Sequence, residues 1–132
     1  MRAYLGILVT GAGLLLSAPA VFAHHSFAAE YDATKPVELK GTVTKVEWTN
    51  PHARFYVDVK DTNGKVTNWN LELASPNVLT RNGWTRHSLK EGDVITVQGS
   101  RAKDGDNLAN ARTVVLADGK KVFAGSATDN GQ

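Results

Sequence analysis

The sequence predicts a small, mainly β protein: a five-stranded OB-like barrel with one short helix between strands three and four. Three observations lead to this class. After residue 36, apolar and polar side chains alternate in five runs; a helix signal separates the third run from the fourth; and the first run is long and bent. Three strands, one helix and two strands is the element order of an OB fold. A β-sandwich of similar length is the alternative that alternation alone leaves open.

The first predicted strand changes phase along its length. Apolar residues alternate from Val37 to Val43 and resume in the opposite phase at Val46. This shift predicts a bulge or bend near Thr44. A glycine inside the strand, Gly41, suits the coiling that a small barrel requires.

The second and third predicted strands form a hairpin. Residues 54–59 and 66–73 alternate, and Asp61-Thr62-Asn63-Gly64 between them is a turn sequence. Trp69 shares the apolar phase and is expected in the core. Asn70 and Glu72 fall on the opposite face, where a polar surface is ordinary for a small antiparallel sheet.

A short helix follows the third strand. Ser75 is the expected N-cap, Pro76 suits the first helical position, and Asn82-Gly83 ends the helix within two turns. The remaining predicted segments are a fourth strand at 92–97, a fifth strand at 108–116 and a short last piece at 122–123.

The sequence predicts a secretory leader before this domain. Arg2 and the apolar run of residues 4–16 match the positive and hydrophobic regions of a signal peptide. The run is shorter than the roughly 20 residues of a spanning helix. Cleavage after Ala23 is favoured, and cleavage after Ala20 competes with it. We therefore expect a periplasmic or secreted protein with no membrane anchor after leader removal.

The expected organisation is a signal peptide at 1–23, an N-terminal arm at 24–35, the OB-like β-barrel domain at 36–124 and a mobile tail at 125–132. The chain has no cysteine, and its one methionine is Met1 in the leader. Disulfides, thiolate metal sites and thioether ligation are therefore excluded. Removing Arg2 with the leader lowers the net charge from +2 to +1, which argues against a nucleic-acid partner.

Histidines supply the candidate metal site. Cleavage after Ala23 makes His24 the N-terminal residue, so its amine and ring Nδ1 can chelate one ion. His52, in the turn after the first strand, is the candidate third ligand. Copper is the expected cofactor, with zinc less favoured, because divalent affinity at nitrogen sites peaks at copper. His25 offers a competing mode, in which the amine, the deprotonated amide and its imidazole bind without a fold.

The alternative to a metal site is that His24 and His25 are solvated and that His52 only hydrogen-bonds within its turn. His87, after the helix, is not expected to be a ligand. Trp48 and Asn50 are candidate ligand-binding residues, because they border the loop at 50–52. In an OB fold, this loop and the one at 101–107 lie near the customary binding face.

Several motifs resemble those of a family of small exported bacterial proteins of unknown function. They are His24-His25-Ser26-Phe27, Glu30-Tyr31-Asp32, Glu47-Trp48-Thr49-Asn50-Pro51-His52, Ser75-Pro76-Asn77 and Gly83-Trp84. The resemblance implies export and an OB-like fold, and no activity. An N-terminal histidine also resembles the copper ligand of periplasmic copper carriers and of copper-dependent polysaccharide monooxygenases. This likeness concerns the metal ligands alone.

No catalytic constellation is present: the chain lacks a nucleophile elbow, a phosphate-binding glycine loop and an H-E-x-x-H helix. We therefore expect no enzyme. The leading hypothesis is an exported binding protein that stores or delivers Cu(II). The alternative is a metal-free module that binds a peptide, a glycan or an envelope protein.

Overall fold

The computed structural model describes residues 27–125, so the expected leader, His24, His25 and residues 126–132 of the expected tail lie outside the described residues. The elements in chain order are α1 (Phe27–Glu30), β1 (Tyr31–Glu47), β2 (Arg54–Lys60), β3 (Val66–Glu72), α2 (Pro76–Arg81), β4 (Val94–Ala102), β5 (Leu108–Val115) and β6 (Lys121–Phe123).

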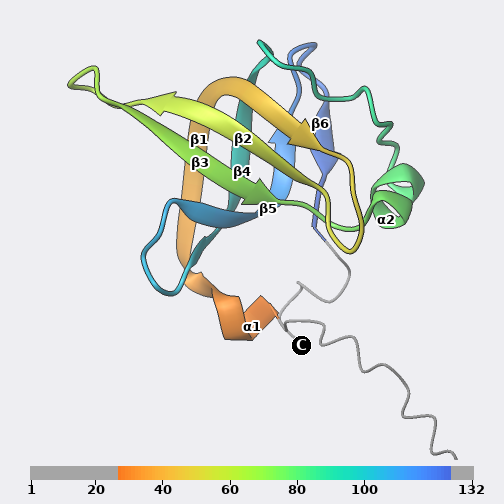
Figure 1. Ribbon diagram of the computed structural model, residues 1–132, viewed down its shortest axis with the longest axis horizontal. Helices are drawn as coiled ribbons and strands as arrows, with labels where there is room; N and C mark the ends of the chain where they lie inside the picture. Colours follow the sequence, from red (N-terminus) through yellow and green to blue (C-terminus); the bar gives the residue numbers. More distant parts are fainter. Residues whose placement is uncertain (1–26, 126–132) are drawn as a thin grey trace, which may run out of the picture.

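The strands pair as an OB-like barrel (Figure 1). β1 pairs with β2 and β4, β2 with β3, and β4 with β5, all antiparallel. The parallel pairing of β3 with β5, from Asn70–Leu108 to Glu72–Asn110, closes the circuit. The predicted fold class is therefore confirmed. The short last piece forms β6, which extends the sheet beyond β5.

The bulge, the helix cap and the turn that the local sequence predicts are present in the structure. The β1–β2 register shifts between Val43 and Lys45, which is the bulge expected near Thr44. Ser75 caps α2 by accepting a hydrogen bond from the backbone of Val78. Gly64 closes the β2–β3 turn with a positive φ of 83°.

The segment expected as an arm differs from the prediction. Residues 27–30 form the helix α1, and β1 begins at Tyr31, where it pairs with Ala102 of β4. The barrel therefore starts five residues earlier than the expected boundary at 36. The physical reason is that Tyr31 is buried, which a count of apolar alternation from Val37 cannot reveal.

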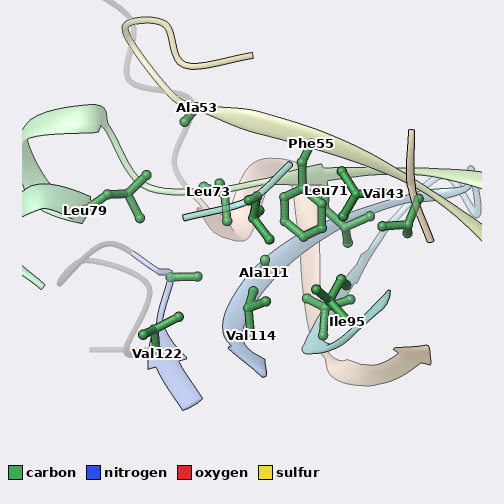
Figure 2. Packing of buried hydrophobic residues seen from close by; sticks show 14 of the residues in the cluster. Val43, Ala53, Phe55, Leu71, Leu73, Leu79, Ile95, Ala111, Val114 and Val122 are labelled. Atoms are coloured by element: carbon green, nitrogen blue, oxygen red, sulfur yellow. The ribbon is translucent and has the colours of Figure 1, made fainter. Parts of the chain in front are cut away.

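The core fills the barrel interior and continues under α2 and β6. Figure 2 shows Phe55, Leu71 and Ile95 meeting inside the barrel, with Leu79 of α2 beyond one end. Trp84 closes the same end, where its Nε1 donates to the carbonyl of Phe123 at 2.8 Å. No helix among residues 27–125 is long and apolar enough to cross a membrane.

One glycine marks a close approach that the barrel requires. A Cβ on Gly99 would lie 1.9 Å from the carbonyl oxygen of Asn110 in β5. The β4–β5 register also shifts between Gln98 and Gly99. Because the obstructing atom belongs to the backbone, any side chain here must push the two strands apart.

We expect Gly99→Ala to lower the free energy of unfolding by about 2 kcal/mol or more, because overpacked sites cannot relax without backbone movement. Val94→Ala is the control in the same strand, since Val94 is 53% exposed, and it should cost less than about 1 kcal/mol. Urea unfolding followed by circular dichroism measures both. An equal loss of unfolding free energy in Gly99→Ala and Val94→Ala would show that β4 and β5 can separate at Gly99.

Candidate functional site

A buried glutamate lies at the centre of a polar cluster on the outer face of β2 and β3. Glu72 is the last residue of β3, and its side chain is only 7% exposed. Leu71 and Leu73 are core residues, so alternation directs Glu72 away from the barrel interior. Its burial therefore comes from groups that cover the outside of the barrel.

Three side chains from different parts of the chain surround this carboxylate. The Tyr31 hydroxyl donates to Oε2 of Glu72 at 3.0 Å, and Arg54 Nη2 donates to the same oxygen. His52 Nδ1 lies 2.8 Å from Oε1. We call these four residues the Glu72 cluster. Within residues 27–125, no buried side-chain nitrogen or oxygen lacks a hydrogen-bond partner.

Arg54 is held in place from two directions. It is the cross-strand partner of Glu72 in the β2–β3 ladder, and its Nη1 donates to Asn70 Oδ1 at 3.2 Å. This ion pair balances the charge of the buried carboxylate. Burying both charges costs solvation energy that their attraction roughly offsets, so such a pair contributes little net stability.

Tyr31 connects the cluster to α1, which lies at the start of β1 (Figure 1). Its ring packs on that of Phe27, with centroids 5.6 Å apart and planes 32° apart. The carbonyl of Glu30 accepts a hydrogen bond from the backbone of Lys103 at 2.9 Å. Burial, and then the nearby Glu72 carboxylate, raises the pKa of the Tyr31 phenol.

His52 lies between β1 and β2, after a cis Asn50–Pro51 peptide bond. Its neighbour Ala53 exchanges backbone hydrogen bonds with the chain after β3: Ala53 donates to Ala74 at 3.1 Å and accepts from Leu73 at 2.8 Å. His52 is therefore held against the end of β3. Its side chain remains 34% exposed, so a solvent-borne ligand has access to the ring.

The other candidate residues are dispersed. Trp48 is half-buried and packs against the hydrophobic core, and Asn50 is exposed in the β1–β2 loop. His87 lies in an exposed turn after α2. Trp69 is in the core, as predicted. The two remaining histidines, His24 and His25, lie outside the described residues.

The two loops expected at one binding face contact different parts of β3. Arg101, which the structure places in β4 instead of the expected loop, lies over the Trp69 ring, 5.2 Å from its centroid. The carbonyl of Asn107 accepts from the backbone of Asn70 at 3.0 Å. His52 instead contacts Glu72 at the strand's end. Figure 1 shows the β1–β2 and β4–β5 loops well apart.

Sequence reasoning missed Tyr31, Arg54 and Glu72. Glu72 was expected on an ordinary solvated face, which is wrong, because Tyr31 covers that face of β3. The local sequence carries no signal of this burial, because Leu71-Glu72-Leu73 is the alternation expected of a strand with one solvated face.

The described part of the chain contains no group of three or more histidine, cysteine, aspartate or glutamate side chains that could hold a metal ion. His52 is the one candidate metal ligand from the sequence that lies within this part of the chain.

Comparisons with known proteins give a family. A model of a family of unknown function, DUF6152, matches residues 12–111. No curated protein matches the chain. Two crystal structures of Rim1, a mitochondrial single-stranded DNA binding protein from S. cerevisiae, are similar to it, with TM-scores of 0.49 and 0.45 at 8% and 11% identity. Each match covers 62% of this chain and 92% of the other.

The raised pKa of Tyr31 predicts a loss of stability in alkaline solution. The unfolded chain releases this proton near the ordinary pKa of 10.0, while the folded protein retains it. The contribution of Tyr31 to the free energy of unfolding is therefore complete below that pH. Above it, this contribution falls by up to about 1.4 kcal/mol per pH unit. Tyr31→Phe should remove this slope, and Tyr56→Phe should keep it. Urea unfolding at increasing pH measures the slopes, and equal slopes in wild type and Tyr31→Phe would contradict the assignment.

Proposed function

This chain belongs to DUF6152, a family of unknown function, and we propose that it is an exported protein that binds Cu(II) for storage or delivery. In this proposal, a signal peptidase cuts after Ala23. The amine and ring Nδ1 of His24 then occupy two positions on the ion, and His52 supplies the third nitrogen. Zn(II) is a weaker fit to the same ligands.

One observation carries the proposal: a continuous series of contacts runs from α1 to His52. Phe27 packs on Tyr31, Tyr31 donates to Glu72, and Glu72 binds His52. His24 precedes Phe27 by three residues, and three residues of extended chain span at most about 11 Å. The link from α1 to His52 through one buried carboxylate supports His24, three residues before Phe27, as the ligand that would join His52.

The ligand inventory supports the same conclusion. His52 is partly exposed, yet no complete metal-ligand group lies within residues 27–125. A site built on His52 must recruit further ligands, and an N-terminal histidine supplies two. The chain has no cysteine and loses Met1 with the leader, so its metal ligands are nitrogen and oxygen atoms, which suit Cu(II).

The first experiment is an intact-mass measurement on the exported protein, followed by Cu(II) titration and electron paramagnetic resonance. We expect a chain that begins at His24, sub-micromolar affinity and a three-nitrogen signal. His52→Ala should remove one nitrogen and weaken binding by about tenfold or more, which is about 1.4 kcal/mol or more. His87→Ala, an exposed histidine outside the cluster, should change neither property.

Two further variants separate this site from binding by the N-terminal peptide alone. His25→Ala removes the competing amine–amide–imidazole mode and should leave the three-nitrogen signal intact. Three alanines placed before His24 should abolish the signal; a single alanine is unsuitable, because it would make His25 the third residue, a position that itself binds Cu(II). A chain that begins at Val21, or a copper signal unaffected by His52→Ala, would overturn the proposal in favour of the metal-free module.

A further inference from the structure

The contact with Glu72 determines which ring nitrogen of His52 carries the hydrogen. A carboxylate accepts hydrogen bonds and donates none. In the contact of 2.8 Å between Glu72 Oε1 and His52 Nδ1, the hydrogen therefore belongs to Nδ1. The neutral ring then has its lone pair on Nε2. That is the tautomer a metal ion requires if it is to bind through Nε2.

The carboxylate itself is held by groups from several elements. Oε2 receives the Tyr31 hydroxyl from β1 and Arg54 Nη2 from β2, which leaves Oε1 for His52. The Glu72 backbone is paired on both sides, with Arg54 in β2 and Asn110 in β5. Glu72 thus has little freedom to rotate away from His52.

We infer that Glu72 is a positioning residue that presents His52 as an Nε2 metal ligand. The inference rests on the proposed function, and it assigns Glu72 a role that its ion pair with Arg54 alone does not require. Metal-binding histidines almost always donate their second ring N–H to a carboxylate, a carbonyl or water, which fixes the ring and raises its basicity. The Glu72 cluster has this arrangement before any metal is bound.

Stability alone does not account for the cluster. Replacing a buried ion pair by apolar residues of similar volume is often neutral or stabilising. Here the buried carboxylate has an additional partner, a histidine whose side chain is 34% exposed. An orienting role explains why the acid contacts a residue at the surface as well as Arg54 and Tyr31.

The test is Glu72→Gln in the chain with a mature His24 terminus. Glutamine keeps the size of the side chain and an oxygen for His52, but it loses the negative charge. We expect Cu(II) affinity to fall 10- to 100-fold, the usual effect of removing an orienting partner. Asp58→Asn is the matched control: it removes the same charge from the same outer sheet face, where Asp58 Oδ1 binds Asn68 at 2.8 Å. It should leave affinity unchanged.

A double-mutant cycle separates positioning from a general structural effect. In the His52→Ala background, Glu72→Gln should have no further effect on Cu(II) affinity, because Glu72 acts through His52. An equal loss in both backgrounds, or no loss in either, would overturn the inference. If His52→Ala loses a copper nitrogen and Glu72→Gln has no effect on Cu(II) affinity, the inference is overturned and the proposed function is not.

A measurement without metal tests the orienting role of Glu72 even if Glu72→Gln does not fold. Nitrogen-15 NMR of the imidazole in wild-type apo-protein, in mildly alkaline solution, reports the tautomer directly. We expect the hydrogen on Nδ1 of His52, and a mixture of tautomers at the exposed His87. Tyr31→Phe removes one donor to Glu72 Oε2 and leaves Oε1 facing His52, so it should keep the hydrogen on Nδ1. A hydrogen on Nε2 of His52 in the wild type would contradict the inference.

Discussion

The parallel pairing of β3 with β5 is the constraint on which the rest of the structure depends. Asn110 of β5 pairs with Glu72 on one side and with Ser100 of β4 on the other. Without this contact the strands would form an open sheet, and the interior apolar side chains would have no opposite wall. The pairing of β4 with β5 on the other side explains why position 99 lacks room for a side chain, because the Asn110 carbonyl occupies the space that a Cβ would need.

Closure of the barrel also creates the Glu72 cluster. Glu72 is the last residue of β3 and lies at the seam, so the start of β1 crosses its outer face and Tyr31 covers it. A carboxylate in this position would be costly without partners. Arg54, Tyr31 and His52 supply them, and His52 extends the cluster to the surface. Metal binding at His52 would therefore use a ligand that barrel closure has already oriented.

Local sequence determined much of the fold. Alternation predicted β2 and β3, the phase shift predicted the bulge next to Val43, and Ser75-Pro76 predicted the start of α2. These features depend on neighbours in the chain: side-chain direction alternates along a strand, and a serine hydroxyl caps the backbone three residues later. The element order and the long, bent first strand then favoured an OB-like barrel over a β-sandwich.

Tertiary structure decided the site. His52 was a candidate from sequence, but its partner Glu72 is 20 residues away and Tyr31 is 41 residues from Glu72. Alternation correctly placed Glu72 on the outer face and could not show that another segment buries that face. The sequence by itself thus determined the strands, the turns and which histidines are candidate ligands, since these follow from local side-chain chemistry. Only the folded chain decided that an arm becomes part of the barrel and that a surface glutamate becomes a buried partner of His52, because burial depends on contacts between distant residues.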